Sequence, residues 1–162
     1  MNAHEGRQNH AVDGAVLSTV GWREWMVLPA LGIPAVKAKI DTGARSSTLH
    51  AFQLDTYRDR GAERVRFAFH PLRKRDDLAL VCDTEVLDRR VVSDSGGHRE
   101  RRVVIETPVR LGEQEWTIEV TLTNRDSMLF RMLLGRTALA GRFLVDSSLS
   151  YCYGRALRRS YR

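Results

Sequence analysis

The stretch Lys39-Ile40-Asp41-Thr42-Gly43-Ala44 decides how the rest of the chain is interpreted. The alternating residues 36–40 (VKAKI) predict a β-strand that delivers Asp41 to a turn of small residues. Gly43 lets another backbone or a ligand come close to the carboxylate. Asp and Gly also dominate ordinary turns, so the three residues D-T-G taken alone indicate either a catalytic acid or a structural turn.

The length and composition of the chain predict one globular domain. A chain of 162 residues can bury a sizeable core, and 43% of its residues are apolar. No stretch approaches the ~18 continuous apolar residues that cross a bilayer, and the first residues, MNAHEGRQNHAVDG, lack the apolar segment of a secretory signal. We therefore expect a cytoplasmic protein with no membrane partner. Cys82 and Cys152 have no CxxC spacing and are expected to be free thiols.

The positive charge of the chain indicates either an acidic partner or a gene of biased base composition. The net charge is +6, and it is carried by 23 arginines against 3 lysines. Arginine forms planar bidentate pairs with carboxylates and phosphates, so a functional excess indicates an acidic peptide or a nucleic acid. The absence of an aromatic RNP motif and of a helix-turn-helix pattern argues against a nucleic-acid partner. The alternative is that the excess reflects only the base composition of the gene.

Most of the chain consists of short β-prone runs separated by turn signals. Strands are expected at residues 22–28, 34–40, 48–54, 63–69, around Cys82, and at 85–92, 99–107, 108–111, 116–122, 130–134, 143–146 and 150–153. The connections are expected to be a charged turn at 57–61, a polar loop at 70–78, a Gly-rich hairpin tip at 93–98 and one short helix at 136–141. Many short strands with one short helix predict an all-β barrel or sandwich.

Composition also divides the chain into three parts. Residues 1–18 are polar and aperiodic, so a disordered N-terminal arm is expected there. Residues 19–154 form the β domain, and residues 155–162 form a basic tail.

Three motifs in order resemble the retropepsins, which are single-domain aspartic peptidases. They are I-D-T-G-A at 40–44, the Gly-rich hairpin at 93–98, and M-L-L-G-R at 132–136 before the helix. The longer stretches VGWREW, KIDTGARSSTLHA, VSDSGGHRE and LTNRDSMLFRMLLGRTALAGR are similar to the RimB family over residues 20–154. The resemblance implies a closed β-barrel of six or seven strands with a β-hairpin flap and one short C-terminal helix.

The same resemblance implies the site. Asp41 would be the catalytic aspartate, Thr42 and Gly43 would brace its loop, and residues 133–136 would support that loop. Two carboxylates must share one proton in such a site, and the chain carries one D-T-G, so the resemblance implies a homodimer that pairs two copies of Asp41. The residues expected to contact substrate are Ala44, Arg45, Ser95, Gly96, Gly97, His98, Arg99 and Arg136.

The departures from the retroviral pattern indicate the substrate. Retroviral members follow D-T-G-A with two acids, the first of which pairs with the Arg of the Gly-Arg segment, whereas this chain has Arg45 and Ser46 there. A second positive charge therefore lies beside Arg136, and Arg99, Arg101 and Arg102 follow the flap. A cleft with one sign of charge attracts the opposite sign, which predicts an acidic peptide substrate. The alternative is that these arginines are solvated residues of edge strands.

The family context narrows this expectation. RimB-like proteins are associated with RimK-like ATP-grasp ligases, which add glutamates to a ribosomal protein. The resemblance therefore implies hydrolysis of glutamate-rich tails, either poly-α-glutamate or a glutamylated ribosomal protein. A binding module that holds acidic or glutamylated partners without hydrolysis is the alternative.

No cofactor is expected, although the RimB family was long labelled a putative ATP-dependent zinc protease. The five histidines show no helical zinc-ligand spacing, and there is no GxxxxGK[ST] loop for ATP. Convergence of Cys82 with His50, His70 and His98 through the fold stays open; the other two histidines are His4 and His10.

Overall fold

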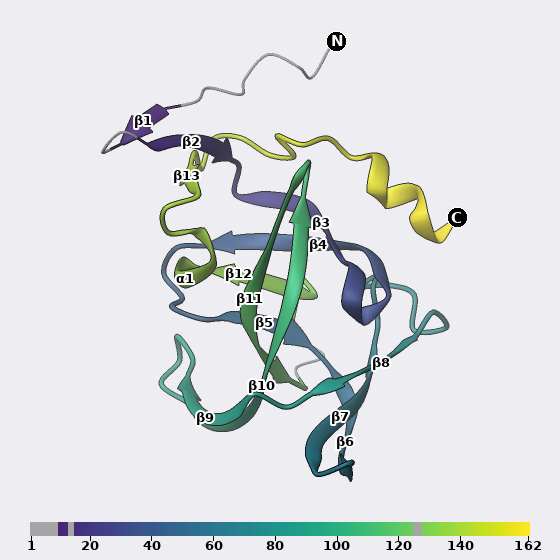
Figure 1. The fold of residues 1–162 in the computed structure, drawn as a ribbon. Coiled ribbons are helices and arrows are strands. Elements are labelled where there is room, and N and C mark those ends of the chain that lie inside the picture. Colours follow the sequence, from purple (N-terminus) through teal and green to yellow (C-terminus); the bar gives the residue numbers. More distant parts are fainter. Residues whose placement is uncertain (1–9, 13–14, 125–127) are drawn as a thin grey trace.

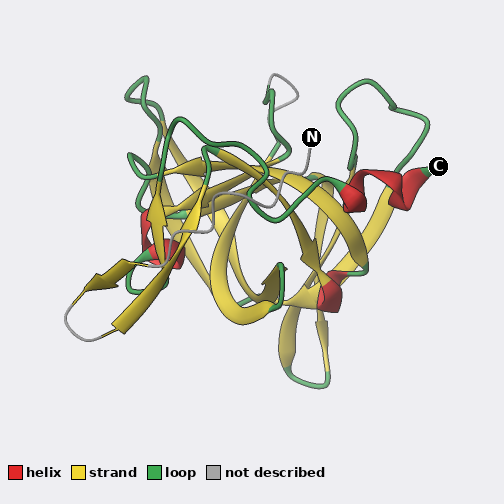
Figure 2. Ribbon diagram, turned by 90° about the horizontal axis from the view of Figure 1, so that it is seen from above, coloured by secondary structure: helices red, strands yellow, loops and turns green. Residues whose placement is uncertain are grey.

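Six strands close into a barrel in the computed structural model, which describes residues 10–12, 15–124 and 128–162 (Figures 1 and 2). Their order around the barrel is β11-β5-β12-β4-β3-β10, and β10 pairs back onto β11. The strands are β3 (Arg23–Leu28), β4 (Ile33–Asp41), β5 (Ser47–His50), β10 (Arg99–Leu111), β11 (Gln114–Thr123) and β12 (Met132–Gly135). This architecture confirms the predicted closed all-β, retropepsin-like barrel.

Alternation of apolar and polar residues explains which side chains of these strands point into the core. In β4 the side chains of Val36, Ala38 and Ile40 are buried, whereas Lys39 is exposed. In β11 the predicted apolar face is buried; its members are Trp116, Ile118, Val120 and Leu122. These residues belong to one continuous core with the other barrel strands.

Two smaller sheets and the flap surround the barrel. Strand β9 (Asp88–Ser93) pairs with the first half of β10 and forms the expected hairpin. A second sheet contains β6 (Phe52–Asp59), β7 (Ala62–Phe69) and β8 (Leu80–Glu85), and a third contains β1 (His10–Val12), β2 (Ala15–Val20) and β13 (Phe143–Val145). The helices are α1 (Arg136–Leu139) and the 3₁₀ turns η1 (Pro29–Leu31) and η2 (Ala156–Tyr161). No helix in these described ranges is long and apolar enough to cross a membrane.

Parts of both terminal segments contain regular structure. Within the expected disordered arm, residues 10–12 and 15–18 belong to strands, and β2 pairs in parallel with β13. The rest of that arm, residues 1–9 and 13–14, lies outside the described residues. In the expected basic tail, Tyr161 of η2 exchanges hydrogen bonds with the backbone of Ala35, so this end packs against β4.

Four strand and turn predictions need correction. The expected strand at 48–54 is two strands that separate at Ala51, where the chain leaves the barrel for the second sheet. The expected charged turn at 57–61 is narrower, because β6 continues to Asp59. The expected strand at 108–111 is the end of β10, which runs unbroken through Pro108. Residues 150–153 form no strand, and Tyr151 there has a φ of 53°.

A buried carboxylate explains the shape of that last segment. Glu24 of β3 is fully buried, and its side chain accepts hydrogen bonds from the backbone N–H groups of Gly21 (2.8 Å), Cys152 (3.0 Å) and Tyr153 (3.3 Å). Two backbone donors of the C-terminal segment are therefore satisfied by a side chain, whereas the Tyr151 N–H donates to the Arg23 carbonyl of β3.

Candidate active site

Asp41 ends β4 and begins a tight loop. Its Oδ1 atom accepts hydrogen bonds from the backbone N–H groups of Gly43 (3.0 Å) and Ala44 (3.2 Å). A side chain at position 43 would place Cβ only 3.3 Å from that oxygen, so glycine suits the position. Thr42 and Gly43 are exposed, and the carboxylate is half-buried beside them.

The end of β12 and the start of α1 contact this loop. Gly135 pairs with Asp41 in parallel register, and a Cβ on Gly135 would lie 2.4 Å from the backbone oxygen of Ser46. The Arg136 N–H donates to the Ala44 carbonyl (2.7 Å), and the Arg136 Nη1 donates to the Thr42 carbonyl (3.1 Å). These contacts hold the backbone around Asp41 from both sides.

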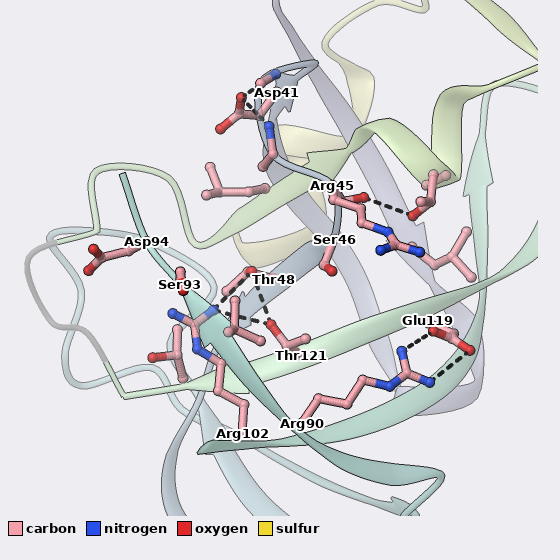
Figure 3. Close-up of a pocket in the computed structure, with 18 of the residues that line it drawn as sticks. Asp41, Arg45, Ser46, Thr48, Arg90, Ser93, Asp94, Arg102, Glu119 and Thr121 are labelled. Atoms are coloured by element: carbon pink, nitrogen blue, oxygen red, sulfur yellow. Dashed lines mark hydrogen bonds and ion pairs between the residues drawn. The ribbon is translucent and has the colours of Figure 1, made fainter. Parts of the chain in front are cut away.

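The Asp41 loop opens into a cleft of about 1310 Å³ between the flap and the barrel (Figure 3). The flap contributes strand β9 and the beginning of its tip, and the opposite wall comes from β5, β11 and α1. Residues that line the cleft include Asp41, Gly43, Ala44, Arg45, Ser46, Thr48, Arg90, Ser93, Asp94, Ser95, Arg102, Trp116, Glu119, Thr121, Thr123, Thr137 and Arg142.

The structure brings together about half of the site residues expected from sequence. The cleft wall contains Asp41, Gly43, Ala44, Arg45 and Ser95. The other expected residues lie outside that wall; they are Thr42, Gly96, Gly97, His98, Arg99 and Arg136.

Local hydrogen bonds explain the positions of the flap turn and of Arg136 outside the cleft wall. The side-chain Oδ1 of Asp94 accepts from the N–H groups of Gly96 and His98, both at 2.9 Å, and this tight turn leaves residues 95–98 exposed. Arg136 is turned toward the Thr42 carbonyl instead of toward the cleft.

The flap strand is joined to the barrel wall by an ion pair that the sequence did not indicate. Arg90 of β9 donates to Glu119 of β11 (Nη1–Oε2, 2.5 Å) and to Asp88 (Nε–Oδ2, 2.8 Å). The hydrogen bond from Arg90 holds the pKa of the Glu119 carboxyl below its ordinary value, and the charge of Arg45 acts in the same direction. Arg90 is thus paired with two carboxylates, and Arg102 is paired with Glu100; the lining also contains Arg45 and Arg142.

Arg102 lies on the cleft wall with its side chain only 5% exposed. Its Nε donates to Glu100 (3.0 Å), and its Nη1 donates to Thr121 (3.2 Å) and Thr48 (3.4 Å). Figure 3 shows the guanidinium turned toward these two threonines. The sequence predicts Arg102 as a positive charge near the cleft but not as a substrate contact, because its neighbours come from β5 and β11 and only the strand register reveals them.

The possible zinc ligands do not converge. Among the described residues no group of three or more His, Cys, Asp or Glu side chains could hold a metal. His50 and His70 each lie beside Phe52, with ring centroids at 6.2 and 4.1 Å, and His98 is exposed on the flap. Cys82 is buried, and burial raises the pKa of its thiol to about 11.

The barrel, the D-T-G loop and the hairpin over it define a retropepsin-like fold. Residues 19–156 match the family described as RimB-like, retropepsin-like aspartic endopeptidase RimB. The match covers most of the chain, and the chain belongs to this family.

The chain is also similar to longer proteins and to a solved structure. It is 45% identical over 135 residues to a Shewanella pealeana protein and 43% identical over 141 residues to a Desulfotalea psychrophila protein, both named "Probable alpha-L-glutamate ligase". These matches cover 83% and 87% of this chain but only 30% of each relative. A Legionella pneumophila protein of unknown function has 28% identity and a TM-score of 0.69, over 82% of this chain and 95% of that one.

Proposed function

We propose that this protein is a homodimeric aspartic peptidase that hydrolyses peptide bonds in acidic, glutamate-rich tails. The observation that carries the proposal is the position of Asp41, whose D-T-G loop opens into the cleft beneath a hairpin flap in a member of the RimB-like family. In such a site one carboxylate acts as the general base for water while its protonated partner polarises the scissile carbonyl.

The partner carboxylate is the reason for proposing a dimer. Among the described residues, no other carboxylate is hydrogen-bonded to Asp41. Asp94 lines the same cleft, but its Oδ1 is occupied by the backbone of the flap turn. Thr42 and Gly43 are exposed, so a second copy of the chain can approach the loop and bring its own Asp41 to a two-fold axis.

The charge of the cleft supports an acidic substrate. Among the described residues, the cleft lining contains four arginines, Arg45, Arg90, Arg102 and Arg142, against three acids, Asp41, Asp94 and Glu119. A low-dielectric wall with this balance favours bound carboxylates. Proteins named for α-L-glutamate ligation contain a segment similar to this chain, which supports glutamate tails as the substrate and a functional link to RimK-like ligases.

The same relatives support a second candidate, a module that binds glutamylated partners without hydrolysis. In those proteins the matching segment is less than a third of a chain that is named for ligation. A domain that held the growing tail for the ligase would need the same cationic cleft but would have no need of Asp41.

The test is Asp41→Asn, with Asp76→Asn as a control because Asp76 is an exposed carboxylate of the 70–78 loop. Cleavage of α-linked oligoglutamate by equal concentrations of each protein would be followed by mass spectrometry. Asp41→Asn should lose at least ~100-fold in rate, which is the lower end of what a general acid–base contributes, while Asp76→Asn keeps full activity. Undiminished cleavage by Asp41→Asn would refute the peptidase, and tight binding with no turnover from pH 3 to 8 would favour the binding module.

The dimer has its own test. Titrating the inactive Asp41→Asn protein into the wild type exchanges subunits and forms mixed dimers with one aspartate. Activity per wild-type chain should then fall as the variant is added. Constant activity, or a monomer in sedimentation at concentrations that support cleavage, would exclude a shared dyad.

A further inference from the structure

The guanidinium of Arg102 has hydrogen-bond capacity that the protein does not use. A guanidinium has five N–H donors: one on Nε and two on each Nη. The Nε donor goes to Glu100, and the two Nη1 donors go to Thr48 and Thr121. Among the described residues no acceptor is hydrogen-bonded to Nη2, so two donors remain open.

These open donors belong to a residue of the cleft wall. Arg102 is part of the cleft lining, and its Nη2 atom is not fully buried. The threonines fix its direction, because the Thr121 hydroxyl also bonds to the Ser47 carbonyl (3.3 Å) and the two hydroxyls bond to each other (3.1 Å). The guanidinium is therefore fixed at the cleft wall by its Nε and Nη1 bonds, with Nη2 unpaired among the described residues.

The charge of Arg102 is incompletely matched within the protein. Its side chain is only 5% exposed, while its carboxylate partner Glu100 is 47% exposed and is screened by water. A cation in a buried position is costly unless anions or hydrogen bonds compensate it. A role limited to packing would be served by a neutral side chain of the same length, whereas a bound carboxylate would use both the charge and the two free donors.

We propose that Arg102 is a specificity-determining residue whose Nη2 binds a carboxylate of the substrate. This inference rests on the proposed acidic substrate and adds the residue that selects it. The carboxylate belongs to a glutamyl side chain or to the C-terminus of the peptide, which carry the same chemistry. Arg102 contacts substrate without taking part in proton transfer.

The test compares Arg102→Gln with Arg101→Gln in the Asp41→Asn background, where bound peptide is not turned over. Arg101 precedes Arg102 on β10, is exposed and lies outside the cleft wall, so it controls for net charge and for position on the strand. Titration calorimetry with α-linked oligoglutamate should show 10- to 100-fold weaker binding for Arg102→Gln, which is about 1.4–2.8 kcal/mol. Arg101→Gln should change the dissociation constant less than 3-fold.

Modified peptides separate the two sources of the carboxylate. If a side chain is bound, one Glu→Gln replacement in the peptide should weaken wild-type binding and have no further effect on Arg102→Gln. If the terminus is bound, C-terminal amidation should behave in that way instead. Equal losses for Arg101→Gln and Arg102→Gln would mean a general charge effect and would overturn the proposal.

A second variant covers the case in which Arg102→Gln does not fold. Glu100→Gln keeps an oxygen for the Nε of Arg102 and for Thr123 while it removes the competing charge. It should bind oligoglutamate more tightly, with Glu113→Gln in the exposed β10–β11 turn as the control. No tightening, or the same tightening in both variants, would refute the subsite.

The outcomes also separate this inference from the peptidase proposal. Arg102-dependent binding without cleavage would keep the subsite and exclude the peptidase. Cleavage that is insensitive to Arg102 would exclude the subsite alone. Absence of oligoglutamate binding by the wild type would exclude both.

Discussion

Replacing Glu24 by alanine should destabilise the protein by about 4 kcal/mol, although Glu24 is not part of the cleft lining. The carboxylate is fully buried and accepts three backbone N–H groups, two of them within 3.0 Å. A hydrogen bond to a charged group contributes about 1.5–3 kcal/mol, so the two short bonds together give about 3–6 kcal/mol. For a domain of this length, about 4 kcal/mol lowers the melting temperature by about 8–16 °C.

Glu24→Gln provides the intermediate case. The amide oxygen can replace Oε2 and keep the bonds to Gly21 and Cys152, but the amide N–H₂ then faces the Tyr153 N–H. A neutral acceptor forms bonds about half as strong as a charged one, so about 2 kcal/mol and 4–8 °C should be lost.

Calorimetry on wild type, both variants and Glu113→Gln would measure these effects at one pH. Glu113 is exposed in a hairpin turn, and its replacement should stay within about 0.5 kcal/mol. Burial and the nearby charge of Glu24 raise the pKa of the Cys152 thiol to about 11, so Glu24→Ala should also speed its alkylation. A melting temperature within 1 °C of wild type for Glu24→Ala would refute the reasoning.

Two further predictions concern the loop support and the second sheet. Gly135→Ala places Cβ 2.4 Å from the backbone oxygen of Ser46, which cannot move aside as a side chain can. The substitution should lower the free energy of unfolding by about 3 kcal/mol or prevent folding. A melting curve identical to that of the wild type would contradict this. Hydrogen bonds from Tyr57 and Arg64 hold the pKa of the Asp83 carboxyl below its ordinary value, so its contribution to stability is present above about pH 4 and is lost as the pH falls through the folded-state pKa. Asp83→Asn should therefore lower the melting temperature at pH 7, with the difference from wild type closing at lower pH; a difference independent of pH would exclude this linkage.

Features that depend on neighbouring residues could be predicted from the sequence. The strand into Asp41, the hairpin at 93–98 and the helix beginning at Arg136 follow from alternation, glycine placement and helix propensity. The resemblance added the barrel closure, because no local pattern states which strands pair. The run through Pro108 was missed because proline usually ends a central strand. Along one edge of β10, the pairing with β9 ends at Val104 and the pairing with β3 lies at Arg110. Pro108 lies between them, so its missing N–H removes no hydrogen bond along that edge.

Features that depend on register could not be predicted. Arg102 meets Thr48 and Thr121 only because β5 pairs in parallel with β11, with Thr48 opposite Thr121. The Arg90–Glu119 pair likewise joins two strands that no sequence spacing connects. The burial of Glu24 could not be predicted, because a polar residue in an alternating strand is normally exposed. Here the C-terminal segment covers it.

The way the Asp41 loop is held has a consequence for how such proteins diversify. The carbonyls of Thr42, Ala44 and Arg45 are bonded by the segment that follows β12, whereas the side chain of Arg45 forms no hydrogen bond among the described residues. Position 45 can therefore mutate freely in charge and size while the aspartate stays where it is. Under the proposed function, substitutions at this residue should change peptide preference without moving Asp41.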